Sequence, residues 1–174
     1  MSFCQPSWIQ GQPGNGRELR TALGCYPTGV AIIATLSPEG RAVGLTVNSF
    51  ASVSMDPPLV HWSLAQRSPS LPAFDGATHF SVSVLAEDQE ALCRRFANPA
   101  VPDKFAGIDT VPGAHGIPLV GGAVAQFECR KESRMVGGDH VVFVGQVERF
   151  RWREGAPLLF HGGTFVQLPL LKAA

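Results

Sequence analysis

The sequence is organised as strand-like runs that follow one another across tight turns. The runs at 27–37 and 41–49 flank Pro-Glu-Gly, and the longer runs at 123–136 and 140–152 flank Gly-Gly-Asp. Two such runs separated by a short turn predict a β-hairpin. No regular alternation of strands with helices runs through the chain, which argues against a doubly wound parallel sheet. We therefore expect a mainly-β, antiparallel fold.

The remaining runs bring the tally to six or seven strands and two or three short helices. Additional strands are predicted at 58–65, 79–86 and 157–168. Short helices are predicted at 17–26, ended by Gly24, and at 87–98. The proline-rich stretch 98–118 is predicted to be irregular. A closed or nearly closed antiparallel barrel with helices at its ends fits this order.

The composition is that of one globular domain. The chain has 174 residues, and we expect a flexible, Gly- and Pro-rich arm at 1–16 followed by a single domain at 17–174. Hydrophobic residues make up 45%, charged residues 16%, and the formal net charge is zero. That balance argues against nucleic acid or a membrane as partner. Because no signal peptide or membrane-length apolar run is recognisable, a cytoplasmic protein is expected.

Common catalytic motifs are missing from the sequence. It contains no G-x-G-x-x-G, no G-x-x-x-x-G-K-[ST], no G-x-S-x-G and no H-E-x-x-H. The four cysteines and five histidines are scattered without metal-ligand or disulfide spacing, so no metal site is expected. Glu87, Asp88 and Glu90 are placed in the first turn of a helix, where they complement the helix dipole. If the chain is an enzyme, we expect a cofactor to carry the chemistry.

The segment QRSPS at 66–70 is a first candidate for a cofactor contact. Ser68 followed by Pro69 is typical of a helix N-cap and first helical position. The free N–H groups of a helix N-terminus bind phosphate, and Arg67 lies beside them. The alternative interpretation is an ordinary capped helix with a surface arginine.

A second candidate is the row of short polar side chains that ends the strand at 41–49. Thr46 and Asn48 share one face of the strand and Ser49 takes the other. Such groups suit the polar rim of a flat heterocycle, and they suit a polar strand end followed by a loop equally well. Residues 52–58 are interpreted as a turn into the next strand.

The third candidate is the turn Gly137-Gly138-Asp139, which leads into His140. A histidine at a turn exit is typical of a solvated side chain. It becomes a candidate site residue if this turn meets the other two polar segments in space.

Six segments, in this order and spacing, carry a resemblance to a known family. They are YPTGVAIIAT, GLTVNSFASVSMDPPLV, RSPSL, FSVSVLAEDQEALCRRFA, DKFAG and VGGDHVVFVGQV, within roughly residues 18–168. Together they closely resemble the flavin reductase-like family, small NAD(P)H:flavin oxidoreductases that serve two-component monooxygenases. The resemblance implies an FMN-binding split β-barrel with Greek-key-like antiparallel strands, assembled as a homodimer.

The resemblance also implies a set of site residues. The cofactor-binding positions are Pro27, Thr28, Gly29, Val30, Thr46, Val47, Asn48, Ser49, Ser63, Leu64, Arg67, Ser68, Phe96, Lys104, Phe160 and His161. Within this set, 67–68 match phosphate-binding positions and 160–161 lie over the open flavin face. His140 matches the Gly-Asp-His element and is the expected catalytic residue, positioning the nicotinamide. The chain departs from the family at 47–49, where Ala-Ser-Ser is frequent, and in lacking an arginine near its C-terminal end.

The activity implied by the resemblance is hydride transfer from NADH or NADPH to FMN, with FAD also possible. Reduced flavin would then pass to a separate oxygenase component. One alternative is a split-barrel flavoprotein that keeps FMN bound and acts on an organic substrate. Another is a non-enzymatic flavin-binding or redox-sensing module, and a third is a barrel whose polar strand ends are only loops.

Overall fold

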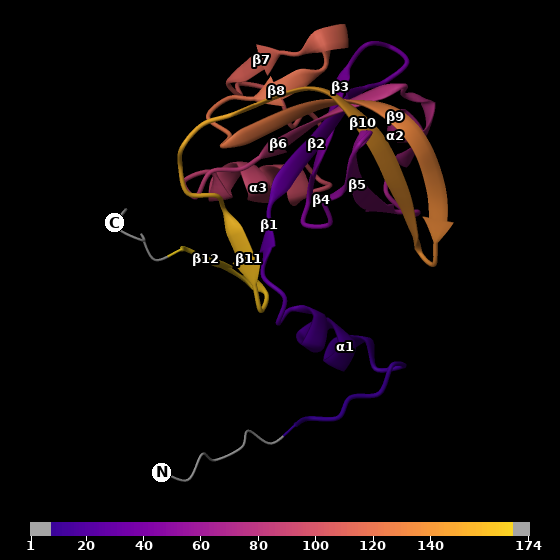
Figure 1. The fold of residues 1–174 in the computed structure, drawn as a ribbon, viewed down its shortest axis with the longest axis vertical. Helices are drawn as coiled ribbons and strands as arrows, with labels where there is room; N and C mark the ends of the chain where they lie inside the picture. Colours follow the sequence, from indigo (N-terminus) through magenta and orange to yellow (C-terminus); the bar gives the residue numbers. More distant parts are fainter. Residues whose placement is uncertain (1–7, 169–174) are drawn as a thin grey trace.

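The computed structural model describes residues 8–168, and this part of the chain is mainly β, as predicted (Figure 1). The strands are β1 (Thr28–Gly29), β2 (Ala31–Leu36), β3 (Ala42–Val47), β4 (Ala51–Met55), β5 (Pro58–Ala65), β6 (His79–Val84), β7 (Thr110–Pro112), β8 (Pro118–Val120), β9 (Ala125–Gly137), β10 (His140–Trp152), β11 (Leu159–His161) and β12 (Thr164–Val166). The helices are α1 (Gly16–Leu23), α2 (Leu71–Gly76), α3 (Glu90–Ala97) and the 3-10 turn η1 (Ala114–Gly116). No helix in the described range has the length and apolar character needed to cross a bilayer.

Seven strands form one antiparallel sheet in the order β3-β2-β6-β9-β10-β5-β4 (Figure 1). The edge strands β3 and β4 follow each other in the chain and are joined only by residues 48–50. Four Cα–Cα steps reach about 14 Å at full extension, so the sheet must curl until its edges approach. The Ser49 side chain completes this approach by bonding to the backbone of Ser63 on β5. The predicted antiparallel split-barrel fold is confirmed.

The two hairpins predicted from local turn chemistry are present. β2 pairs with β3, with Ile33 opposite Leu45, and β9 pairs with β10, with Val136 opposite Val141. The predicted helix near the N-terminus is also present as α1, with Gly24 as its C-cap.

Aromatic side chains fill the interior of the barrel. Trp62 stacks on Phe143 with ring centroids 4.7 Å apart and meets Phe74 edge-on at 4.8 Å. β2 is buried on both faces: Ile33 belongs to this interior cluster, while Ile32 packs outward into a second cluster that includes residues of α3. Burial of this outer face holds α3 against the end of the sheet where β3 terminates.

The stretch 98–118, predicted to be irregular, contains more order than expected. β7 pairs with β8 as a small hairpin, with η1 between them. The hairpin covers the serine face of β6, because Ser81 donates to the Pro118 carbonyl at 2.8 Å and Ser83 accepts from the Val120 N–H at 3.0 Å. A proline ends β7 and another begins β8, and prolines in strands this short obscure the alternation by which a strand is recognised.

Two further expectations were wrong in detail. Ser52 and Ser54 lie in β4, which pairs with β5 through a register shift between these two serines, so they do not belong to a turn. A β-bulge breaks the strict alternation by which a strand is recognised. In addition, α3 begins at Glu90, so Glu87 and Asp88 precede the helix and only Glu90 lies in its first turn.

Candidate functional site

One hydrogen bond ties the end of β3 to α3. The hydroxyl of Thr46 donates to the backbone carbonyl of Cys93 at 2.7 Å. Two clefts open beside this contact, and both are lined by Thr46 and Ala97. The clefts are therefore neighbours, with the β3–α3 contact at their shared wall.

The first cleft has a volume of about 690 Å³ and lies between β3, the segment before α2 and the loop that follows α3. The sequence-predicted positions that line it are Thr46, Ser68, Phe96 and Lys104. The Lys104 ammonium donates to the Phe96 carbonyl at 2.7 Å, and burial lowers the pKa of this lysine. A lysine held at the wall in this way is a point donor for an anionic group such as phosphate.

Gly44 on β3 lines the first cleft and was missed by the sequence analysis. A Cβ at this position would lie 2.8 Å from ring atoms of both Phe96 and Phe105. These two rings pack edge-on with centroids 4.8 Å apart, so they occupy the space that any side chain would need. A lone glycine inside a strand pattern is the available sequence signal, because it marks a close approach of other groups.

The second cleft has a volume of about 610 Å³ and lies between the end of β3, α3 and the β11–β12 turn. The sequence-predicted positions that line it are Val30, Thr46, Val47, Asn48 and Phe160. Arg94 also lines it and was missed: its guanidinium lies 5.0 Å from the Phe165 ring centroid and pairs with Glu90 at 2.6 Å. The four-residue spacing from Glu90 to Arg94 is a helix-face pattern and carries no signal for a binding site.

The polar residues that end β3 divide into structural and accessible groups. The Thr46 hydroxyl donates its hydrogen bond to the Cys93 carbonyl. The Ser49 hydroxyl accepts from the Ser63 N–H at 2.9 Å and donates to the Ser63 carbonyl at 3.3 Å. Asn48 is exposed and lines the second cleft, so it is the residue of this row whose side chain is not used in a hydrogen bond within the described part of the fold and remains accessible.

The expected helix N-cap at Ser68 was wrong. The N-cap of α2 is Ser70, and α2 spans only six residues beginning at Leu71. Ser68 lies in the preceding turn, where its hydroxyl accepts from the Ser70 N–H at 3.3 Å. The helix begins two residues later than predicted, at Ser70-Leu71-Pro72, so a helix dipole does not support phosphate binding at Ser68.

The fold brings the Gly-Gly-Asp-His turn beside the segment that contains Arg67. The Gln66 N–H donates to the Asp139 carbonyl at 2.9 Å, and the Gln66 side chain donates to the Gly138 carbonyl at 2.7 Å. Asp139 and the His140 Nδ1 lie 2.7 Å apart. The His140 hydrogen bond and charge, with a smaller contribution from Arg67, lower the pKa of Asp139. Two of the three polar segments singled out in the sequence therefore meet in space.

The other predicted positions line neither cleft. β1 pairs with β11, so Thr28 lies opposite Phe160 and Gly29 opposite Leu159. Thr28 Oγ1 is buried and has no hydrogen-bond partner among the described residues. The Leu64 side chain is buried in the barrel interior, which leaves only its backbone for a ligand. The predicted positions that line neither cleft are Pro27, Thr28, Gly29, Ser49, Ser63, Leu64, Arg67, His140 and His161.

Comparison with curated proteins finds flavin reductases. The chain is 46% identical over 151 residues to the protein named FMN reductase (NADH) SmoA of Agrobacterium fabrum, covering 87% of this chain and 85% of the relative. It is 43% identical over 150 residues to the protein of Rhodococcus jostii named flavin-dependent monooxygenase, reductase subunit HsaB, covering 86% of this chain and 76% of the relative. Two other relatives are longer proteins, and the chain spans 58% and 48% of their lengths.

A solved structure has the same architecture. The NADH:FAD oxidoreductase SgcE6 of Streptomyces globisporus, determined with NAD and FAD fragments, superposes with a TM-score of 0.89 at 35% identity. The match covers 95% of this chain and 100% of that one. The family model described as the flavin reductase like domain matches residues 23–169. This chain therefore belongs to the flavin reductase-like family.

Proposed function

We propose that this chain is an NAD(P)H-dependent flavin reductase that transfers hydride from a nicotinamide to FMN or FAD. The observation that carries this proposal is the pair of adjoining clefts of about 690 and 610 Å³ that share Thr46. Ligand pockets have volumes of about 300–1,000 Å³, so the pair has room for an extended ligand that carries both a ring system and a charged tail. Relatives named as an FMN reductase and an NADH:FAD oxidoreductase support a flavin as this ligand.

The distribution of residues suggests how the flavin lies. The first cleft holds the tail and phosphate, because Ser68 and Lys104 line it and Arg67 is adjacent in sequence to Ser68. The second cleft holds the isoalloxazine ring, because Val47, Asn48 and Phe160 line it. Apolar walls with a few placed polar groups are typical of a site for a planar heterocycle.

A flavin held in these clefts would supply the redox chemistry by taking up hydride from the nicotinamide, for which no side-chain acid or base is needed. The task of the chain is to hold the rings in register and to exclude water. Asn48 orients the edge of the ring, and Phe160 with His161 borders its open face. His140, held by Asp139 beside Arg67, positions the nicotinamide dinucleotide.

The product of the reaction is reduced flavin, which passes to a separate oxygenase component. The relative from Rhodococcus jostii, named as the reductase subunit of a flavin-dependent monooxygenase, supports this hand-off. The assay crosses FMN and FAD with NADH and NADPH and follows nicotinamide oxidation. Turnover with at least one pair is expected, and no oxidation in any of the four pairs would overturn the proposal. Flavin that survives dialysis, combined with no turnover, would instead favour a flavin-binding module.

The proposal also covers assembly, domain organisation and location. A homodimer is supported by the exposed apolar surface of α1. None of the residues of this helix is buried, and its Leu23 and the nearby Tyr26 are 67% and 76% exposed. A second copy of the chain can cover this apolar surface. The predicted division into an arm at 1–16 and a domain at 17–174 falls partly outside the described residues 8–168, within which the first helix begins at Gly16, and we place the domain in the cytoplasm. Light scattering tests the dimer, limited proteolysis tests the arm, and cell fractionation tests the location.

A further inference from the structure

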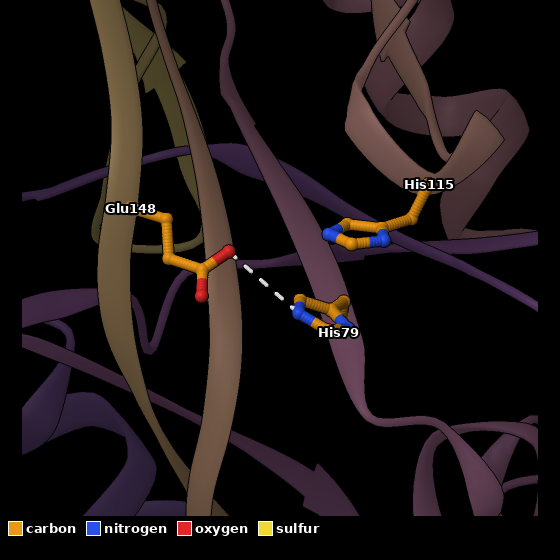
Figure 2. A group of neighbouring side chains, drawn as sticks. All are labelled: His79, His115 and Glu148. Atoms are coloured by element: carbon orange, nitrogen blue, oxygen red, sulfur yellow. Dashed lines mark ion pairs between the residues drawn. The ribbon is translucent and has the colours of Figure 1, made fainter.

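Two histidines and a glutamate that are far apart in the sequence converge on one side of the barrel (Figure 2). His79 lies on β6, His115 in η1 and Glu148 on β10. Their potential ligand atoms all lie within 4.8 Å of one another. The His79 Nε2 is 3.6 Å from the Glu148 Oε2, and the two imidazole rings stack with centroids 3.9 Å apart. Neither cleft of the proposed flavin site includes any of these residues.

The loop that carries His115 is held in a specific conformation. His115 has a φ of 59°, a left-handed value that few residues other than glycine adopt. The preceding Ala114 N–H donates to the Glu128 carboxylate on β9, which anchors the loop to the sheet. A Cβ at Gly113 would lie 2.7 Å from the Ile117 carbonyl, so this tight geometry requires glycine there. Glu128 and Gly113 together direct the His115 ring towards His79.

His79 is oriented by its neighbour in the strand. The Thr78 hydroxyl lies 2.9 Å from the His79 Nδ1. When Nδ1 carries the proton and donates to Thr78, the Nε2 lone pair faces Glu148, which is the arrangement of a metal-ligating histidine with an outer-shell partner. In this tautomer the Nε2 lone pair of His79 is available to a cation.

The charges around the cluster favour a cation. One oxygen of Glu148 lies 3.5 Å from the Arg130 Nε, and Arg130 is also paired with Glu132 at 2.5 Å. Arg149 is paired with Glu128 at 3.6 Å. Three carboxylates therefore pair with or lie near two guanidinium groups. Arg130 lies near the Oε1 of Glu148, while the Oε2 points towards His79 (Figure 2).

We propose that His79, His115 and Glu148 bind a divalent transition-metal ion such as Zn²⁺, with one coordination position left open. Two imidazoles and a carboxylate are a known ligand set for zinc, and imidazole also suits Co²⁺ and Ni²⁺. Zinc–ligand bonds of about 2.0–2.1 Å place tetrahedral ligand atoms about 3.3 Å apart, close to the separation of His79 and Glu148. His115 is exposed, so its ring is free to turn out of the stack and present a nitrogen to the same ion.

The open position faces a hollow of about 350 Å³ that is lined by Thr78, His79 and His115. Ser37, Pro38 and Ala73 line both this hollow and the first cleft, so water and small anions can reach the ion from the same side of the molecule. The expectation of no metal site rested on the spacing of histidines along the chain. The proposal departs from it because the ligands come from three separate elements.

The test uses tag-free, full-length protein, stripped with chelator and without added flavin. Calorimetric titration with Zn²⁺ should give one site per chain, and Co²⁺ should give the visible absorption bands of a low-symmetry site. His115→Asn should weaken Zn²⁺ binding by at least about tenfold while preserving the loop, because asparagine tolerates a left-handed φ. Glu148→Gln should do the same, and Thr78→Val should weaken binding by about tenfold through the loss of the outer-shell partner.

Two matched controls separate this site from other metal-binding groups. His61→Gln removes a histidine of β5 outside the cluster, and Cys25→Ser removes an exposed thiol; both should bind Zn²⁺ like the wild type. The apo variants should unfold at wild-type temperatures, and added Zn²⁺ should raise the Tm of the wild type but not of His115→Asn. No saturable binding to the wild type, or binding that Cys25→Ser abolishes and His115→Asn leaves unchanged, would overturn the proposal.

Discussion

The Thr46 hydroxyl and the Cys93 carbonyl, 2.7 Å apart, join β3 to α3 at the wall shared by the two clefts. A side chain that the sequence analysis placed on the rim of a flavin site thus also holds the site together. We expect Thr46→Val to leave the Cys93 carbonyl without its donor and to lower the free energy of unfolding by about 1 kcal/mol. Urea denaturation measures this loss, and the KM for flavin should rise in the same variant.

Thr46→Ser is the matched control, because it keeps the hydroxyl and removes only a methyl group. It should retain most of the stability and most of the flavin affinity. Equal behaviour of the valine and serine variants would show that the hydroxyl does not matter at this wall.

Gly44 should resist even the smallest side chain. A Cβ at this position would lie 2.8 Å from the Phe96 and Phe105 rings, so Gly44→Ala should displace this wall of the first cleft. Overpacking of this kind costs about 1–3 kcal/mol, and the KM for flavin should rise with it. Gly76→Ala is the control, since nothing lies within 4 Å of a Cβ there. Similar thermal unfolding and kinetics for the two variants would count against a tightly packed wall at Gly44.

Arg67 should distinguish phosphorylated from unphosphorylated flavin. A charge-assisted hydrogen bond contributes about 1.5–3 kcal/mol, so Arg67→Ala should weaken FMN binding by about tenfold or more. Riboflavin, which lacks the phosphate, should bind with unchanged affinity in a fluorescence-quenching titration. Arg134→Ala removes an arginine that pairs with Asp75 and serves as the control. Equal losses of affinity for FMN and riboflavin would show that Arg67 does not contact the phosphate.

His79 should make the metal-free protein sensitive to mild acid. Burial is the main cause that lowers the pKa of His79 below its usual value of 6.5 in the folded state. The unfolded chain therefore binds more protons between the two pKa values, so stability is greatest above pH 6.5 and falls as the pH drops through this window. In the presence of chelator, His79→Gln should flatten this part of the stability profile. If the stability of His79→Gln falls with pH as steeply as that of the wild type, other titratable groups cause the acid sensitivity.

The cysteines should differ sharply in reactivity. Cys25 is exposed, whereas burial, aided by Glu148 and Glu128, raises the pKa of Cys129 to about 12. Only the thiolate reacts with disulfide reagents, so in a Cys4→Ser background Cys25 should react at once and Cys129 only on unfolding. Cys25→Ser in the same background should abolish the fast phase, and a fast phase that persists would indicate local opening around a buried thiol.

The sequence alone determined the two long hairpins. The runs at 27–37 and 41–49 contain β2 and β3, and the Gly-Gly-Asp turn joins β9 to β10, because turn chemistry and side-chain alternation act between neighbouring residues. The ordered set of segments was specific enough to indicate the family, which a family model spanning residues 23–169 confirms.

Only the tertiary structure decided which of these residues share a site. The curl of the sheet brings Ser49 to Ser63, and packing of α3 against β3 creates the clefts that Gly44 and Arg94 line. The same long-range packing brought His79 to His115. These relationships depend on contacts between elements that are distant in the chain, where no local pattern records which side chains will meet.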